Sequence, residues 1–435
     1  GINQGEADMA LRLLAVGDLH LGRRPGGLPD ELDLDHRALG PAAALDRLVR
    51  SAIDEGVDAV AFAGDLVEQE DDFFEAYEDL RRAVQTLVDA GIRVLGVAGN
   101  HDVEVLPALA DALPGFELLG RNGQWQQTGL QSGDGVEVVV HGYSFGQRHV
   151  TRNPLGGRQF QRDARPAIGL LHCDLDQTGS RYAPVARRDL EAAGLDAFLL
   201  GHIHRPDPLG LDNRIGYLGS VTPLRRTETG RHGPWLLTFE RSGLQTIEQW
   251  PLAPLRWQAL EVDLSEPGDA AAAQGRLLEV LRQASETSLD PRFGRPVLGL
   301  DVVFTGRSDD RLELEKRLEG DRLVLRHPED NTPVFVRERV YRLLPQIDLE
   351  QLAKRRDPLG LLAQRLLLLD RPESDPGRRA LLAQARAQRR QVLGQPPWSQ
   401  LPDEPLADAG LEALLRSLLL EAIDTLVAQL REETA

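Results

Sequence analysis

A chain of 435 residues is too long for one compact core, so the sequence predicts two or three globular domains. No stretch approaches the roughly 18 uninterrupted apolar residues of a membrane span, and we expect no membrane attachment. The 50 basic and 68 acidic residues give a net charge of −18, which argues against tight non-specific binding to nucleic acid. A single cysteine, Cys173, excludes an internal disulfide and fits a reducing cytoplasm.

Predicted strands and helices alternate over the first hundred residues. Met9 precedes the first apolar run, and residues 1–8 are left outside the predicted fold. The apolar runs are typical of buried strands and cover Leu11–Gly17, Val57–Ala63 and Ile92–Ala98. Segments 42–55 and 73–88 carry apolar residues at helical spacing. This alternation predicts parallel βαβ units, in which ligands bind beyond the carboxyl ends of the strands.

The next part of the chain is richer in strands. Short apolar runs separated by Gly, Pro and Asp cover 136–141, 167–172, 197–200, 214–218 and 235–240. Two of these runs again lead into histidines, at His172 and His202. The mixture predicts an α/β (α+β) core made of a two-sheet sandwich flanked by helices.

Composition shifts near Pro251, and we expect three domains. They are a core at 9–250, a small α+β capping domain at 251–345 and a helical region at 346–435. The capping segment carries no cluster of His, Asp or Cys that resembles a site.

The helical region is dense in leucine. A proline-rich linker at Gln395–Pro405 separates earlier helical segments from a last helix over about Leu411–Glu432. Its leucine stripe is too broad for an isolated surface helix. The stripe either packs on its own chain or docks the coiled coil of a partner.

Five short islands place carboxylate, imidazole and amide groups at the ends of predicted strands. They are Asp18-Leu19-His20, Gly64-Asp65, Gly99-Asn100-His101-Asp102, His172 and Gly201-His202-Ile203-His204. Seven of these side chains suffice to hold two divalent metals. Nitrogen and oxygen donors without a thiolate suit Mn²⁺, Fe²⁺ or Zn²⁺ better than Mg²⁺.

Asp65 stands alone on its loop and is the expected bridge between the two metals. His202 and His204 point the same way on an extended segment, about 7 Å apart. That spacing reaches two ions roughly 3.5–4 Å from each other. The other six ligands divide as Asp18, His20 and His204 on one ion, and Asn100, His172 and His202 on the other.

A metal pair of this kind activates water for attack on phosphorus, and the departing oxygen then needs a proton. His101, beside Asn100, is the expected general acid. Asp102 either fixes the tautomer of His101 or buttresses the loop. Arg23 and Arg24 follow the first motif and are placed to meet a phosphodiester strand.

The five islands, in this order, resemble the calcineurin-like metallophosphoesterase superfamily. Three later segments are similar to the loop and closing strand of SbcD-type DNA repair nucleases: Tyr217-Leu218-Gly219-Ser220, Glu228-Thr229-Gly230 and Gly233-Pro234-Trp235-Leu236. Two more resemble the YhaO-like branch of that group: Val140-His141-Gly142-Tyr143-Ser144 and the junction Pro251–Trp257. Within the first of these, Tyr143 is expected to contact substrate.

The resemblance implies a manganese-dependent DNA exonuclease and endonuclease subunit that acts in DNA repair by a two-metal mechanism. It implies an SMC-like coiled-coil ATPase as partner and a homodimer. One departure is Glu68, where SbcD-type proteins carry His or Asp; its charge is expected to repel DNA unless a cation intervenes. Two alternatives stay open: a phosphodiesterase or phosphatase for small phosphoesters, and a non-catalytic scaffold for the ATPase.

Overall fold

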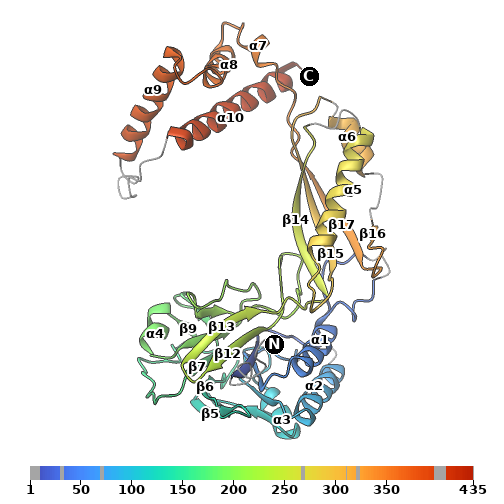
Figure 1. Cartoon of the computed structure of the whole chain (residues 1–435), viewed down its shortest axis with the longest axis vertical. Coiled ribbons are helices and arrows are strands. Elements are labelled where there is room, and N and C mark those ends of the chain that lie inside the picture. The colour runs from blue at the N-terminus through green and yellow to red at the C-terminus, as the bar shows by residue number, and fades with distance from the viewer. Residues whose placement is uncertain are drawn as a thin grey trace, which may run out of the picture. The chain divides into compact units, whose positions relative to one another are not determined.

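The computed structural model describes most of the chain (Figure 1). The described residues are 10–29, 34–68, 73–265, 270–309, 311–319, 324–395 and 408–434. Contacts within the chain divide it into two compact units. The first comprises 1–261, 275–303 and 321–340, and the second comprises 262–274, 304–320 and 341–435. The three-domain division at 250 and 345 stays a prediction.

A six-stranded sheet carries the amino-terminal strands. Its order is β13-β12-β1-β2-β3-β4. The strands are β1 (Leu11–Val16), β2 (Ala59–Phe62), β3 (Arg93–Gly96), β4 (Phe116–Leu118), β12 (Trp235–Glu240) and β13 (Gly243–Gln249). Strands β1 to β4 run parallel, as the alternation with helices predicts, whereas β12 pairs antiparallel with β1 and brings Leu236 opposite Leu14.

A five-stranded sheet forms the second layer, in the order β11-β10-β7-β6-β5. Its strands are β5 (Trp125–Gln131), β6 (Glu137–Tyr143), β7 (Ala167–His172), β10 (Ala197–Gly201) and β11 (Ile215–Tyr217). Strands β6, β7, β10 and β11 are parallel, and β5 is an antiparallel edge. A two-stranded ribbon of β8 (Asp174–Leu175) and β9 (Pro184–Val185) follows the end of β7.

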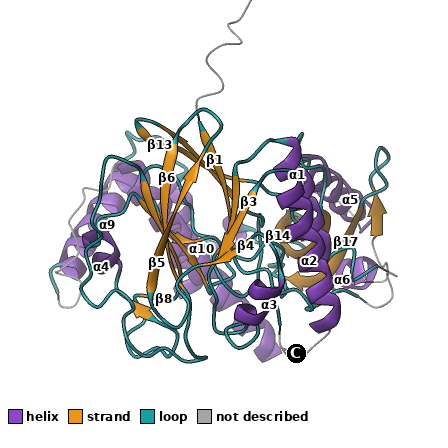
Figure 2. Ribbon diagram, turned by 90° about the horizontal axis from the view of Figure 1, so that it is seen from below, coloured by secondary structure: helices purple, strands orange, loops and turns teal. Residues whose placement is uncertain are grey.

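The two sheets pack face to face. Successive residues of β1 point to opposite faces of its sheet, and both faces of this strand carry buried apolar side chains. Leu11, Leu13 and Ala15 of β1 share one core with Val138 and Ile168 of the second sheet. Leu14 and Val16, which alternate with them in β1, belong to a second core, built with α1 (Pro41–Asp54), α2 (Phe73–Asp89) and α3 (Leu106–Ala112). Figure 2 shows these three helices on one side of the strands and α4 (Arg187–Ala192) on the other. The predicted two-sheet sandwich flanked by helices is confirmed.

A four-stranded sheet, in the order β14-β15-β17-β16, follows the sandwich in the chain. It contains β14 (Leu255–Asp263), β15 (Val297–Thr305), β16 (Val324–Arg326) and β17 (Pro333–Tyr341), with α5 (Ala270–Thr287) and α6 (Arg311–Glu319). The small α+β character of this segment agrees with the expectation. Helix α6 was not predicted, because its sequence is mostly charged and buries only Leu314 and Leu318.

Helices alone make up the last part of the chain. They are α7 (Leu349–Leu352), α8 (Pro358–Leu369), α9 (Pro376–Leu393) and α10 (Asp408–Thr434). Asp357 and Asp375 cap α8 and α9 by accepting backbone N–H groups, and proline occupies the first turn of each helix. The predicted proline-rich linker lies, beyond Gln395, outside the described residues. No helix in the described segments is long and apolar enough to cross a membrane.

Candidate metal centre

The predicted ligands gather where parallel strands of both sheets end. Asp18, Asp65 and Asn100 follow the carboxyl ends of β1, β2 and β3, as neighbouring strands of one sheet. His172 is the last residue of β7, and His202 comes directly after β10, the neighbour of β7 in the second sheet. Carboxyl ends of adjacent parallel strands meet at one edge, so residues far apart in sequence become neighbours.

The first group joins Asp18, His20 and His204, whose potential ligand atoms lie within 4.8 Å of one another. The Nε2 atoms of His20 and His204 are 3.0 Å apart. Asp18 is buried, and both of its carboxylate oxygens accept the backbone N–H of His202 at 3.1 Å. The structure therefore brings together the three side chains predicted for one metal.

The second group joins Asp65, His172 and His202, again with ligand atoms within 4.8 Å. Asn100 completes it, since its Oδ1 lies 3.0 Å from Nε2 of His172 and 3.2 Å from Nδ1 of His202. Oδ2 of Asp65 is 3.3 Å from His172 Nε2. These are the four side chains predicted for the other metal, with Asp65 as the bridge.

Asp65 faces both groups. Its Oδ2 is 3.8 Å from Nε2 of His20 in the first group, besides its contact with His172 in the second. Burial acts against the charged carboxylate, but the surrounding His172, His20 and His101 hold the pKa of Asp65 well below its usual range. A buried carboxylate surrounded by donors on both sides is suited to bridge two cations.

The ring nitrogens that face away from the centre each have a partner of their own. Nδ1 of His20 lies 2.6 Å from Glu68, and Nδ1 of His204 lies 2.8 Å from Glu228. The remaining two contacts are His172 Nδ1 to the Ala63 carbonyl at 3.0 Å and His202 Nε2 to Asp174 at 3.2 Å. Outer partners of this kind fix the tautomer and orientation of histidines that bind metals. The donor set therefore fits two divalent cations.

Three of these ligands have a strained backbone conformation. His20, Asp65 and His202 have positive φ angles of 51°, 52° and 106°. Such conformations cost free energy in non-glycine residues and persist where the surrounding structure enforces them, often at functional sites. Close packing requires glycine at position 201, because a Cβ there would lie 2.1 Å from the Ala63 carbonyl oxygen.

His101 and Asp102 at the metal centre differ in their exposure and in the groups that they contact. The His101 side chain is 33% exposed, and its Nδ1 is 3.1 Å from Glu68. The hydrogen bond with Glu68 raises the pKa of His101, against the effect of burial. Asp102 is fully buried and accepts the backbone N–H groups of Leu66 and Gly99 at 2.6 and 2.9 Å.

The predicted catalytic role of Asp102 needs correction. Glu68, rather than Asp102, is the partner of the His101 ring, so Asp102 does not fix its tautomer. Asp102 ties the loop of Asp65 to the loop of Asn100, because its two oxygens accept N–H groups from both. Of the two roles expected from the sequence, buttressing the loop agrees with the geometry.

Glu68 is enclosed by basic groups instead of facing the substrate with an open charge. Its carboxylate contacts His20, His101 and the Nε of Arg23, the last at 3.3 Å. Burial opposes ionisation, but hydrogen bonds from His101 and His20 hold the pKa of Glu68 below its usual range. The cation needed to offset this departure from the SbcD-type pattern is therefore present. The segment 69–72, which carries three acidic residues, lies outside the described part of the chain.

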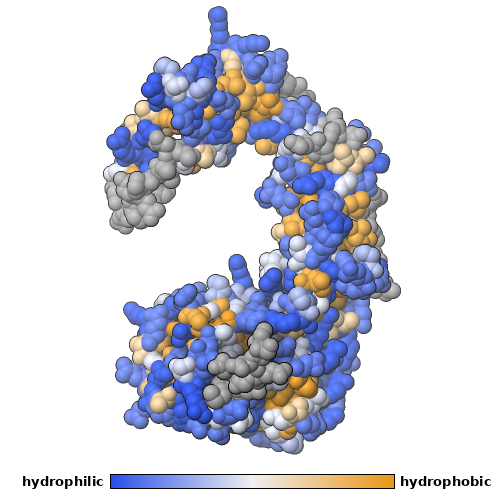
Figure 3. Space-filling model, viewed as in Figure 1, coloured by the Kyte–Doolittle hydropathy of each residue, from blue (hydrophilic) through white to orange (hydrophobic). Residues whose placement is uncertain are grey.

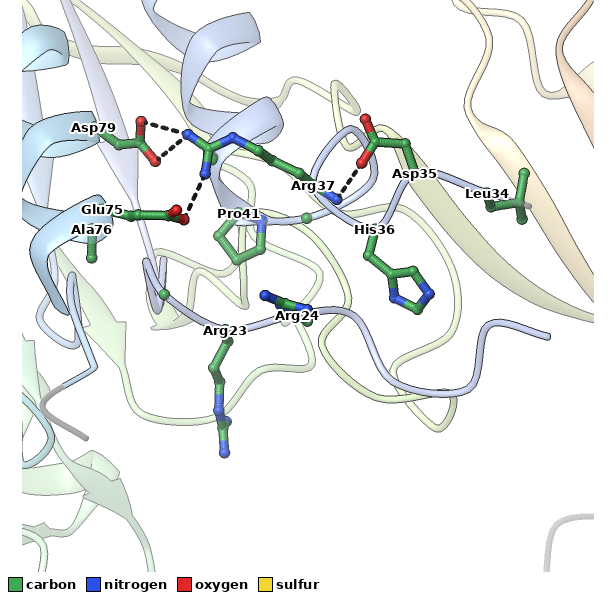
Figure 4. A pocket seen from close by; sticks show the side chains of 13 residues that line it. Arg23, Arg24, Leu34, Asp35, His36, Arg37, Pro41, Glu75, Ala76 and Asp79 are labelled. Carbon is green, nitrogen blue, oxygen red and sulfur yellow. Dashed lines mark hydrogen bonds and ion pairs between the residues drawn. The ribbon is translucent and has the colours of Figure 1, made fainter. Parts of the chain in front are cut away.

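Arg23 and Arg24 line a pocket of about 500 Å³ between the segment after β1 and helix α2 (Figure 4). Arg37 crosses the same pocket and binds Glu75 and Asp79 on α2. Arg23 is half-buried through its contact with Glu68, whereas Arg24 is exposed. Both remain candidates to meet a phosphate group.

Tyr143 does not match its expected contact with substrate. It is 7% exposed, belongs to the second core, which includes helices α1 to α3, and packs against Trp125 with ring centroids 5.5 Å apart. Burial raises the pKa of its phenol. The expectation came from the YhaO-like segment that contains Tyr143, but the folded chain buries this side chain in the core.

Sequence reasoning missed the outer partners of the histidines. Asp174 and Glu68 follow their nearest predicted ligands by two and three residues, so local spacing contained a signal for both. Glu228 lies 24 residues from His204, and only the folded chain brings them together. Tyr182, whose ring lies 4.9 Å from that of His202, was missed for the same reason.

Comparisons with known proteins agree with this geometry. The model of the calcineurin-like phosphoesterase family matches residues 11–206. The chain is 24% identical to the uncharacterized metallophosphoesterase YhaO of Bacillus subtilis, over 53% of this chain and 57% of YhaO. It is 29% identical to the DNA double-strand break repair protein Mre11 of Aeropyrum pernix, over 64% of this chain and 71% of that protein. Identity with SbcD, a component of the SbcCD nuclease of Escherichia coli, is 26%, over 68% of this chain and 78% of SbcD.

The matched residues include each of the five islands and end two residues after His204. The resemblance inferred from the motifs is therefore confirmed. Residues 11–206 form a calcineurin-like metallophosphoesterase domain, in a chain whose relatives include Mre11, SbcD and YhaO.

Proposed function

We propose that this chain is the nuclease component of a DNA repair complex and hydrolyses phosphodiester bonds at two divalent metals, preferably manganese. One observation carries the proposal: seven predicted ligands converge, and the outward nitrogens of their histidines are all held by other groups. This arrangement leaves the inward atoms free to bind cations.

Each metal has a definite set of ligands in this proposal. Asp18, His20 and His204 would hold one ion, Asn100, His172 and His202 the other, and Asp65 both. When bound, such ions lower the pKa of water and neutralise charge on phosphorus. The mixture of imidazole nitrogen and oxygen donors among these ligands, without a thiolate, suits manganese, iron or zinc better than magnesium.

His101 serves as the general acid in this mechanism. Its Nδ1 faces Glu68, so the proton on Nε2 is available to the leaving oxygen at the partly exposed side of the ring. Glu68 keeps the ring oriented, and the backbone N–H of His101 donates to Asp65 at 2.9 Å. The general acid is thereby tied to the bridging ligand.

The names of the relatives support DNA as substrate, and the resemblance of the sequence motifs implies an ATPase as partner. Mre11 is named as a double-strand break repair protein and SbcD as part of a nuclease. We propose that this chain likewise acts with an SMC-like coiled-coil ATPase, as a homodimer in the cytoplasm. Arg23 would hold a phosphate of the strand while it offsets the charge of Glu68.

A cleavage assay with manganese tests the proposal. End-labelled duplex, hairpin and single-stranded DNA are compared with a chromogenic phosphate bis-ester, with and without the ATPase. Asp65→Asn should lower DNA cleavage by at least about 100-fold and reduce bound manganese, because ligands and their supports carry metal affinity.

Asp212→Asn is the matched control, since Asp212 is an exposed carboxylate on a loop before β11. It should cleave DNA as the wild type does. DNA cleavage that survives Asp65→Asn unchanged would contradict the two-metal proposal. Cleavage of the bis-ester without cleavage of any DNA would instead support the small-phosphoester alternative.

A further inference from the structure

A pocket of about 510 Å³ lies apart from the metal centre, in the same compact unit. Thr229 and Arg231 line it from the loop after Glu228, and Arg256 and Gln258 line it from β14. Thr287 lines the pocket at the end of α5, followed by Ser288. The neighbouring backbones are joined, since the N–H of Gly230 donates to the Trp257 carbonyl at 2.9 Å.

Arg256 is buried in this pocket without a partner. It is 8% exposed, and its guanidinium makes neither a hydrogen bond nor an ion pair with any residue that the structure describes. Arg295, which is equally buried, shows the usual arrangement: it binds Asp330 at 3.0 Å and the carbonyl of Ser285. A largely buried charge without an ion pair is costly, so an anion bound in the pocket would stabilise Arg256.

The charges around Arg256 favour an anion in the pocket. Arg231 faces the same pocket and is likewise without an ion pair among the described residues. Burial, with a contribution from Arg231, lowers the pKa of Arg256. Asp290 attracts Arg256 but forms no ion pair with it, and its Oδ1 accepts the backbone N–H groups of Arg292 and Phe293.

The end of α5 does not supply the missing partner. Helix carboxyl ends attract cations through their last carbonyl groups. Here the hydroxyl of Thr287 donates to Gln283, and the carbonyl of Ser285 receives both Ser288 and Arg295. The carbonyls of Gln283 and Ser285 are thus already used by other donors.

We infer that Arg256 and Arg231 form a phosphate-binding subsite. Two guanidinium groups that face one solvent-filled pocket match a phosphate, which accepts several charge-assisted hydrogen bonds. Arg231 follows Glu228 by three residues, and Glu228 supports His204. The subsite deepens the proposed function and rests on it, since a backbone phosphate of DNA bound there would lie against a loop that supports the metal centre.

Inorganic phosphate provides the first test. The melting temperature of the full chain is measured in phosphate and in chloride at equal ionic strength. Phosphate should stabilise the wild type and stabilise Arg256→Gln and Arg231→Gln less, because bound ligand raises stability by mass action. Arg188→Gln is the matched control, since Arg188 is 88% exposed on α4 and should keep the full effect.

DNA provides the second test and distinguishes the source of the phosphate. Binding of a hairpin duplex is measured at several salt concentrations, with EDTA to prevent hydrolysis. If a DNA phosphate occupies the subsite, Arg256→Gln should lower the slope of log affinity against log salt by about 0.9. An unchanged slope, with phosphate stabilisation lost, would assign the subsite to free phosphate.

Equal stabilisation of wild type and both variants by phosphate would overturn the inference. Arg231 is exposed, so Arg231→Gln keeps the test valid if Arg256→Gln does not fold. The melting test does not depend on catalysis. If the wild type cleaves DNA but the variants keep their stabilisation by phosphate, the subsite alone is refuted. If the variants lose this stabilisation but the wild type cleaves no DNA, the nuclease proposal alone is refuted.

Discussion

Glu68 links two functions that are usually separate in a hydrolytic site. One oxygen faces Nδ1 of His20, a predicted metal ligand, and the other faces Nδ1 of His101, the proposed general acid. Arg23 contacts the same carboxylate from the solvent side. The charge that appears unfavourable for DNA in the sequence is thus an internal support for the centre.

This arrangement predicts different outcomes for His101→Ala and Glu68→Gln. His101→Ala should lower kcat by at least about 100-fold, the usual contribution of a general acid, and leave manganese content unchanged. Glu68→Gln should lower both kcat and manganese affinity by about 10- to 100-fold, because the amide has only one oxygen to hold two rings. Steady-state cleavage of a DNA hairpin and metal analysis measure the two effects.

The double variant separates the two roles of Glu68. On the His101→Ala background, Glu68→Gln should lower manganese affinity again but cause little further loss in kcat. Glu104→Gln is the matched control, because Glu104 is exposed on the same loop as His101. Additive losses in kcat would contradict a role of Glu68 through His101.

At the scale of elements, the strands that end at the site could be predicted from the sequence, but the edge strand β5 and the pairing of β12 with β1 could not. The apolar runs predict β1, β2, β3, β7 and β10 to within a few residues, because buried parallel strands are continuous apolar segments. Strand β5 was missed, since its sequence alternates weakly and most of its residues are exposed or half-buried at a sheet edge. The antiparallel pairing of β12 with β1 depends on contacts 220 residues apart that no local pattern encodes.

The candidate site shows the same contrast between what local patterns predict and what depends on long-range contacts. Residue types and spacing predicted the converging ligands, because strand ends meet at one edge of a parallel sheet. The roles of Asp102 and Tyr143 depended on which neighbours their side chains touch. Those contacts come from Leu66 and Trp125, on other elements, and could be found only in the folded chain.

Close packing of the loops makes Gly99 critical. A Cβ at this position would lie 2.2 Å from Oδ1 of Asp65 and 2.8 Å from Cε1 of His172. Gly99→Ala should therefore displace the Asp65 or Asn100 loop, reduce manganese affinity at least about 10-fold and cost about 1–3 kcal/mol in stability. Calorimetric titration with manganese and thermal unfolding measure these changes.

Gly133→Ala is the control for this substitution. Gly133 is exposed, and a Cβ there would meet nothing within 4 Å. Its stability should stay within about 0.5 kcal/mol of the wild type. If Gly99→Ala binds manganese as tightly as Gly133→Ala does, the prediction is wrong, and the loops around Asp65 accommodate a Cβ without disturbing the ligands.

At the scale of the whole molecule, the chain carries more acidic than basic residues, yet its proposed substrate is a polyanion. Attraction to phosphate must therefore come from local groups, such as Arg23 at the centre and Arg256 in the second pocket. The proposed ATPase partner would likewise need a defined surface for recognition. Figure 3 shows apolar residues exposed on the helical part of the chain.

Helix α10 buries some of its apolar residues against its own chain and leaves others exposed. Leu419 and Ile423 are buried in a core with Leu359 and Leu366 of α8, so part of the stripe packs on its own chain. Arg378 of α9 binds Glu412 of α10 at 2.6 Å and adds to this attachment. Leu414 and Leu418 remain 47% and 53% exposed and are one turn apart, the spacing of an apolar contact for a coiled coil.

Charged substitutions on this exposed pair test the partner proposal at the level of assembly. Leu414→Glu with Leu418→Glu should release a coiled-coil ATPase that co-purifies with the chain, because a buried contact would receive two unpaired charges. Since both positions are exposed in the free chain, its melting temperature should change little. Ala413→Glu, at an exposed position roughly 100° round the same helix from Leu414 and roughly 140° from Leu418, adds a charge away from the leucine pair and should retain the ATPase. Retention of the ATPase by the double variant at the wild-type ratio would show that the partner is held elsewhere.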